Sequence, residues 1–263
     1  MSDKLCLQIE DLTISFGGIK AVDHLSFSIK EGEIYGLIGP NGAGKTTVFN
    51  CITQFYKPHS GKVLFNDRKN ETIDLVKLKT HQIIKHGLVR TFQNVELINE
   101  LSVVDNLLVG SHINFKTGII SHGLKTKKAR KEEAELKQKA LDILSYLGIY
   151  DKRDELIAGQ PYGVLKKVEL GRTLMSDPKM IILDEPAAGL NEAETLNLAN
   201  LLKDIRNEYN CTILLVEHDM RLVMDVCDRI CAISFGKKLC EGVPEEIQKN
   251  KDVQEAYLGK GDE

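Results

Sequence analysis

The stretch from Gly39 to Thr47 constrains this chain more than any other part of its sequence. It reads Gly-Pro-Asn-Gly-Ala-Gly-Lys-Thr-Thr and fits the phosphate-binding template G-x-x-x-x-G-K-[ST] at every fixed position. Glycines let backbone N–H groups curve around phosphates, a lysine adds a compact cation, and a threonine hydroxyl can ligate Mg²⁺. The residues expected to contact a triphosphate are Gly39, Asn41, Gly42, Ala43, Gly44, Lys45, Thr46 and Thr47.

The residues on either side of this stretch favour a binding loop over its alternative, an ordinary glycine-rich turn. The apolar run Ile34–Ile38 precedes it and is typical of a buried strand, and helix-compatible residues follow from Lys45. A helix that begins there would direct its first N–H groups at the phosphates.

Length and charge restrict the class of protein. The 263 residues suit one large α/β domain, or a core with a subdomain. The net charge of −3 argues against binding to a nucleic-acid backbone, although a local basic patch remains compatible with it. Six scattered cysteines form no Cys-x-x-Cys pair, so we expect free thiols in a reducing cytosol.

The chain carries no apolar segment of the kind that enters a membrane. No window approaches the roughly 18 apolar residues of a spanning helix, and the first residues lack the apolar stretch of a signal peptide. We therefore expect a soluble chain, whose role at a membrane would come through a partner.

Apolar patterning predicts strands at both ends of the chain. Residues 5–30 alternate like half-buried strands, with a turn at Gly17-Gly18. Two continuous apolar runs, 180–183 and 212–216, are typical of central parallel strands that are covered on both faces. Shorter strands are expected at 61–66, 230–235 and 238–241.

The predicted helices include one long segment in the middle of the chain. Residues 127–147 carry an apolar stripe, and Glu135 and Lys139 are spaced as a favourable i,i+4 ion pair on the solvated side. A short helix is expected over 223–230, and a final helix begins at Pro244, where a missing N–H has no cost.

Polar residues at two strand ends add the chemistry that a phosphate loop lacks. Asp184 follows the run 180–183 directly and is suited to hold Mg²⁺, and Glu185 can polarise an attacking water. His218 follows the run 212–216 and is placed to reach a γ-phosphate, because parallel strand ends meet at one edge of a sheet. The alternative is a strand that ends in acidic residues by chance.

Taken together, these motifs resemble an ATP-binding-cassette (ABC) ATPase over nearly the whole chain. The resemblance implies ATP and Mg²⁺ as ligands, with Glu185, His218 and Lys45 as catalytic residues and Thr46, Gln93 and Asp184 around the metal. Phe16 matches the aromatic that stacks on adenine, Val22 is expected to bind the nucleotide as well, and Gln93 matches the Q-loop glutamine. Residues 188–191 match the D-loop, which crosses to a partner subunit.

The resemblance implies an α/β fold: a P-loop NTPase (RecA-like) core with an antiparallel β subdomain and an inserted α-helical subdomain. It places residues 1–92 and 164–263 in the nucleotide-binding core with its β subdomain and C-terminal helix. It implies that residues 93–163 form the helical subdomain, which would contain the Q-loop and the degenerate signature.

Several sequence segments are similar to those of the ATPases of branched-chain amino-acid importers, in particular their longer ATPase subunit. These segments are residues 103–110, 184–191, 217–220 and the ending Ala256-Tyr257-Leu258-Gly259. ATPases for urea or amide import and for lipopolysaccharide export share much of the same sequence and stay open as alternatives. A soluble ABC protein that works on ribosomes or DNA, and a regulatory subunit that does not hydrolyse ATP, stay open as well.

The resemblance also implies partners and a location. These are a second, non-identical ABC ATPase subunit, with a homodimer left open, two transmembrane permease subunits, and indirectly a periplasmic or lipoprotein solute-binding protein, but no nucleic acid. The chain would lie peripherally on the cytoplasmic face of the membrane.

The signature motif departs from the family pattern. In place of Leu-Ser-Gly-Gly-Gln the chain reads Gln160-Pro161-Tyr162-Gly163-Val164, which keeps only the glycine at 163. Proline offers neither a hydroxyl nor an N–H to a phosphate. The resemblance therefore predicts an asymmetric complex, in which the site completed by this motif is the weaker one.

Overall fold

The computed structural model describes residues 4–91, 96–111 and 126–258. The chain divides into two compact units, one made of Met1–Arg90 with Lys179–Glu263 and the other of Thr91–Pro178. The sequence-based division at 163/164 differs from this one because it falls inside helix α6 (Tyr162–Leu174), which lies whole in the second unit.

The first unit is built on a six-stranded sheet in the order β10-β9-β3-β8-β7-β6. Five neighbouring strands run parallel, and β10 pairs antiparallel with β9 at one edge. Every residue of β3, β7 and β8 is buried, as their continuous apolar runs predict. The strands are β3 (Ile34–Ile38), β6 (Leu88–Arg90), β7 (Met180–Asp184), β8 (Thr212–Val216), β9 (Arg229–Ser234) and β10 (Lys237–Gly242).

A second sheet in this unit is antiparallel, in the order β2-β1-β4-β5. Its two long strands alternate buried and exposed residues and are joined at Gly17-Gly18, where both glycines have positive φ. Irregular register near Asp11 and His24, which also have positive φ, bends the pair. The strands are β1 (Leu5–Phe16), β2 (Ile19–Lys30), β4 (Ser60–Asn66) and β5 (Thr72–Asp74).

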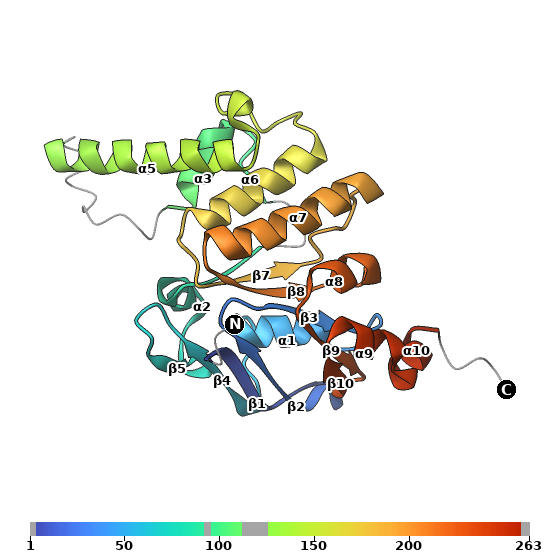
Figure 1. Cartoon of the computed structure of the whole chain (residues 1–263). Helices are drawn as coiled ribbons and strands as arrows, with labels where there is room; N and C mark the ends of the chain where they lie inside the picture. Colours follow the sequence, from blue (N-terminus) through green and yellow to red (C-terminus); the bar gives the residue numbers. More distant parts are fainter. Residues whose placement is uncertain (1–3, 92–95, 112–125, 259–263) are drawn as a thin grey trace. The chain divides into compact units, whose positions relative to one another are not determined.

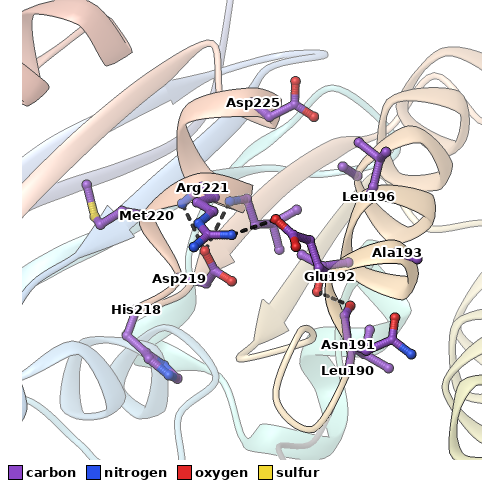
Figure 2. A pocket seen from close by; sticks show the side chains of 13 residues that line it. Leu190, Asn191, Glu192, Ala193, Leu196, His218, Asp219, Met220, Arg221 and Asp225 are labelled. Carbon is purple, nitrogen blue, oxygen red and sulfur yellow. Dashed lines mark hydrogen bonds and ion pairs between the residues drawn. The ribbon is translucent and has the colours of Figure 1, made fainter.

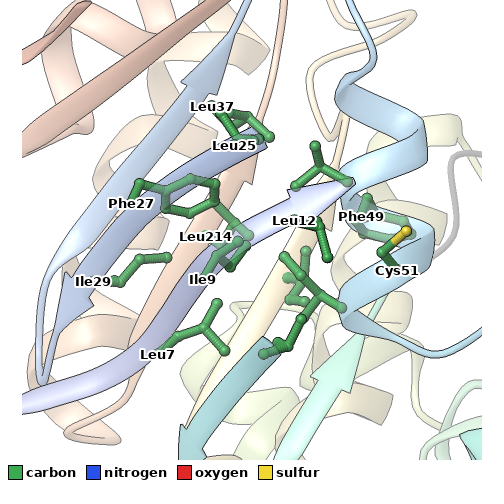
Figure 3. Close-up of a cluster of buried hydrophobic side chains, with 14 of the residues drawn as sticks. Leu7, Ile9, Leu12, Leu25, Phe27, Ile29, Leu37, Phe49, Cys51 and Leu214 are labelled. Carbon is green, nitrogen blue, oxygen red and sulfur yellow. The ribbon is translucent and has the colours of Figure 1, made fainter. Parts of the chain in front are cut away.

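One apolar core joins the two sheets through helix α1 (Lys45–Ile52) (Figure 3). Side chains from the antiparallel sheet, such as Ile9 and Leu25, pack with Phe49 of α1 and with Leu214 of β8. The start of α1, and with it the phosphate loop, is therefore fixed on both sides by packed strands.

Two further helices of the first unit begin at side-chain caps. Helix α7 (Glu192–Glu208) has a capping box between Asn191 and Glu194, and helix α8 (Met220–Val226) is capped by Asp219. In Figure 1, α7 and α1 lie on opposite sides of the parallel sheet. The others are α2 (Thr80–Ile83), α9 (Pro244–Lys249), α10 (Lys251–Leu258) and 3₁₀ turns at Leu75–Lys77 and Ile84–His86.

The expectation of a helix over 223–230 is wrong in position. Asp219 accepts hydrogen bonds from the N–H groups of Arg221 and Leu222, so α8 begins three residues earlier than expected. The helix ends at Val226, and Arg229 already opens β9.

The second unit is helical among its described residues. It contains α3 (Val103–Val109), α5 (Lys127–Tyr146), α6 and a 3₁₀ turn at Tyr150–Lys152. The predicted pair between Glu135 and Lys139 is wrong: Lys139 Nζ bonds Asp177 Oδ2 at 2.6 Å, and Lys131 lies 3.7 Å from Glu135. In the described part of the chain, no helix combines the length and apolar character needed to span a bilayer.

Candidate functional site

The phosphate loop connects the end of β3 to the start of α1. Gly42 and Gly44 have φ values of 78° and 105°, a region that residues with a Cβ rarely adopt. A Cβ at Gly44 would also lie 2.5 Å from the carbonyl oxygen of Ala21, and one at Gly39 would overlap the carbonyl oxygen of Ile233. Close backbone packing therefore requires a glycine at 39 and 44, and the curvature of the loop requires one at 42 and 44.

Lys45 is the first residue of α1 and is only 7% exposed. Its Nζ donates hydrogen bonds to the carbonyl oxygens of Gly39 at 2.6 Å and Pro40 at 3.2 Å. Burial lowers the pKa of its ammonium, while the nearby carboxylates of Glu185 and Asp184 act to raise it. The cation is thus held inside the loop, close to two acidic groups.

Asp184 and Glu185 lie where β7 ends, next to the end of β8 in the parallel sheet. Burial, followed by the charge of Glu185, raises the pKa of Asp184 to about 6. Glu185 has a φ of 47° and donates its N–H to the carbonyl oxygen of Val216 at 2.8 Å. A non-glycine residue in this conformation is held there by its surroundings, and such residues concentrate at functional sites.

The raised pKa of Asp184 predicts how the ligand-free chain responds to pH. Because this pKa lies above the value of 3.8 for an exposed aspartate, the folded chain holds this proton more tightly than the unfolded chain. The destabilisation by the buried charge is therefore present above about pH 6 and disappears as the pH falls towards about 4.

We expect Asp184→Asn to raise the free energy of unfolding of the ligand-free chain at pH 8, by about 1 to 3 kcal/mol. The gain should shrink as the pH falls below about 6. Urea unfolding of the variant and the parent chain across this pH range checks the prediction. A variant that is less stable at pH 8, or a gain independent of pH, would contradict it.

His218 follows β8, and its imidazole is largely exposed. Its Nδ1 lies 3.6 Å from Glu185 Oε1 and 3.8 Å from Glu217 Oε2. His218 and Glu185 therefore lie close together at neighbouring strand ends, and Glu185 is near enough to Lys45 to act on its pKa. Glu217 was not predicted as a site residue, and the only signal for it was a charged residue directly after a buried strand.

Phe16 and Val22 differ in exposure. Phe16, at the end of β1, is 46% exposed, and its ring makes a T-shaped contact with the ring of Tyr56, with 5.2 Å between centroids. Val22 is 0% exposed and packs in the apolar core. An aromatic ring is thus exposed at Phe16. The side chain of Val22 is buried in the apolar core and presents no surface to a ligand.

Comparisons with known proteins show the family of this chain. The family model described as ABC transporter matches residues 22–188. The chain belongs to this ABC transporter family. A second model, described as branched-chain amino acid ATP-binding cassette transporter, matches residues 237–263. The P-loop ATPase fold with an antiparallel sheet and a helical segment, expected from the sequence, is therefore confirmed.

Two curated ABC proteins are similar over nearly their whole length. The high-affinity branched-chain amino acid transport ATP-binding protein LivG of Salmonella typhimurium is 44% identical, with 97% of this chain and 98% of that protein covered. The corresponding protein BraF of Pseudomonas aeruginosa is 41% identical with the same coverage. A solved ATP-binding cassette of an ABC transporter, in its ADP conformation, superposes with a TM-score of 0.83 at 32% identity, covering 97% of this chain and 99% of that chain. This chain is an ABC ATPase.

The ABC signature region lies in the second unit, at the start of α6. Pro161 is the N-cap residue, and no side chain caps the helix. The N–H groups of Val164 and Leu165 bond the carbonyl oxygen of Pro161, so the first turn is formed without the serine that the family uses. The Q-loop residue Gln93 lies outside the described residues.

A pocket of about 1170 Å³ opens between the starts of α7 and α8 (Figure 2). Its lining includes Leu190 and Asn191 of the D-loop stretch on one side, and His218 with Asp219 on the other. Arg221 Nη1 bonds Glu192 Oε1 at 2.7 Å across it. The D-loop stretch and the histidine thus border the same open space within the first unit.

Proposed function

We propose that this chain is the ATP-hydrolysing subunit that energises the import of branched-chain amino acids. The observation that carries the proposal is the meeting of three groups at one edge of the parallel sheet. They are the phosphate loop after β3, the pair Asp184-Glu185 after β7, and His218 after β8, on strands adjacent in the order β3-β8-β7. The similarity to LivG and BraF, and the family match at residues 237–263, support the choice of transported substrate.

Each side chain has a distinct part in hydrolysis. Lys45 donates hydrogen bonds from its ammonium to the β- and γ-phosphates. The phosphate oxygens compete for this ammonium with the carbonyl oxygens of Gly39 and Pro40, which it bonds in the structure. Glu185 accepts the hydrogen bond of the attacking water and polarises it, and His218 contacts the γ-phosphate. Phe16 stacks on adenine.

Oxygen donors suited to Mg²⁺ are present beside the loop. The Thr46 side chain is exposed in the first turn of α1, and Asp184 carries its carboxylate at the end of β7. A hydroxyl and a carboxylate fit this hard cation, and we infer that both hold it, with Gln93 as a further contact. When bound, Mg²⁺ neutralises charge on the phosphates.

The proposed assembly contains a second, non-identical ABC ATPase subunit and two transmembrane permeases, and it works with a solute-binding protein. The chain would be peripheral on the cytoplasmic face of the membrane, held by the permeases. ATP would lie between the two ATPase subunits, so that their closure and hydrolysis drive the permeases.

An affinity pull-down tests the proposal. The tagged chain is recovered from mildly solubilised native membranes, and its companions are identified by mass spectrometry. Two permeases, a second cassette subunit and a solute-binding protein that takes leucine, isoleucine or valine are expected. A urea- or amide-binding protein, or lipopolysaccharide-export components, would replace the proposed substrate. Ribosomal or DNA-repair proteins would overturn the transport role.

The altered signature favours a second candidate, a subunit that binds nucleotide without turnover. We expect Pro161→Ser with Val164→Gln to raise ATP turnover of the assembled complex severalfold, because a hydroxyl and an amide become available to the phosphate across the interface. Steady-state ATPase assays at saturating ATP measure this.

Serine at the N-cap also stabilises a helix by about 1 kcal/mol. Thermal unfolding of the isolated variant therefore separates a gain in stability from a gain in rate. An unchanged turnover in the double variant would contradict the prediction that the site completed by residues 160–164 is the weaker one. A parent complex without measurable turnover would favour the second candidate.

A further inference from the structure

Glu217 belongs to the strand-end cluster, which consists of Asp184, Glu185, Glu217 and His218 at the ends of β7 and β8, and the proposed mechanism gives it no part. It directly follows β8 and is 0% exposed. Its Oε1 accepts the N–H of Ala187 at 2.8 Å, and its Oε2 accepts the N–H groups of His218 at 3.0 Å and Asp219 at 3.3 Å. A single carboxylate thus serves three backbone donors.

These donors come from two separate turns. Ala187 lies in the turn after β7, two residues beyond Glu185, and its neighbour Ala188 donates its N–H to the carbonyl oxygen of Glu185. His218 and Asp219 form the turn after β8. Between the strands, the N–H of Glu185 bonds the carbonyl oxygen of Val216 at 2.8 Å. Glu217 is therefore a second tie between the same two turns, made by a side chain.

Because Glu217 is buried, its bonds to the two turns depend on the carboxylate group itself and not only on the shape of the side chain. A buried carboxylate is tolerated when several N–H groups donate to it, and such charge-assisted bonds are stronger than neutral ones. Glutamine has the same shape but only one accepting oxygen, and its NH₂ group would face an N–H that can no longer be satisfied. The change from Glu to Gln therefore releases one of the two turns without leaving a cavity.

We propose that Glu217 is a positioning residue that sets His218, the histidine that contacts the γ-phosphate, against the water-polarising carboxylate of Glu185. The proposal rests on the roles given above to Glu185 and His218. It assigns Glu217 no contact with nucleotide: the carboxylate acts through the two turns that it joins. The 3.6 Å separation of His218 Nδ1 and Glu185 Oε1 is the geometry that it maintains.

The test is Glu217→Gln in the assembled complex, with Glu33→Gln as the matched control. Glu33 is 2% exposed and also accepts a backbone N–H, that of Lys30 at 2.7 Å, but it pairs with Arg229 outside the strand-end cluster. We expect Glu217→Gln to lower kcat about ten- to a hundredfold, with KM for ATP changed less than threefold, as for loss of alignment. The control should leave both constants within about twofold of the parent values.

A double-variant comparison shows whether Glu217 acts through His218. In a chain that already carries His218→Ala, adding Glu217→Gln should reduce kcat by no more than about twofold, because the group that it positions is absent. A full, multiplicative loss in that background, or a loss equal to that of the control, would overturn the proposal.

Amide hydrogen exchange gives a readout that needs no turnover and no variant. In the parent chain the amides of Ala187 and His218 should open together and show protection factors within about threefold of each other. Markedly different protection factors for the amides of Ala187 and His218 would also overturn the proposal that Glu217 joins the two turns. Failure of the proposed function appears separately, as Glu185→Gln that leaves turnover intact, whatever the exchange result.

Discussion

Glu185→Gln in the assembled complex is expected to lower ATP turnover by about a hundred- to ten-thousandfold, the range for removal of a general base. The amide keeps the shape of the side chain but cannot take a proton from water. The backbone of Glu185 is held by its bond to Val216 and by its neighbours, so the substitution should leave the turn in place. ATP affinity should therefore change little, and the loss should fall on kcat.

The measurement is single-turnover and steady-state hydrolysis, together with direct binding of ATP by calorimetry. Glu208→Gln, an exposed acid at the end of α7, is the matched control and should hydrolyse ATP at the parent rate. Near-normal hydrolysis by the Glu185 variant would show that another group polarises the water.

The sequence predicted the parts of the site that are written in local patterns. The phosphate loop was found because its glycines are fixed by backbone geometry, as the positive φ of Gly42 and Gly44 illustrates. The strands before Asp184 and His218 were found because central parallel strands are apolar on both faces. Their order in the sheet was not predicted and comes from the structure, while the fold class that the family resemblance implied is confirmed.

What the sequence missed depends on contacts between distant residues. Lys139 bonds Asp177, 38 positions away, and no local spacing reveals this choice over Glu135. Glu217 bonds Ala187, 30 positions away, so its role appears only when two strand ends are placed side by side. The burial of Val22 likewise follows from the packing of two sheets, because its own strand alternates in a way that suits either face.

Lys45→Met is expected to weaken ATP binding about ten- to a hundredfold and to abolish most turnover at cellular ATP concentrations. A charge-assisted hydrogen bond to phosphate contributes about 1.5 to 3 kcal/mol, which corresponds to this range. Methionine fills nearly the same volume, so the core around α1 should remain packed. Without a cation, the carbonyl oxygens of Gly39 and Pro40 also lose the ammonium that they now share.

Calorimetric titration with Mg²⁺ and ATP measures the effect of Lys45→Met, and Lys62→Met on exposed β4 surface is the control for loss of a positive charge. The control should bind ATP as the parent does. An unchanged affinity in the Lys45 variant would mean that the backbone of the loop alone holds the phosphates. Lys45→Met should act mainly on ATP binding and therefore raise Kd. Glu185→Gln should act on the chemical step and therefore lower kcat with little change in Kd. The same pattern in both variants would mean that the loop and the strand end cannot be perturbed independently.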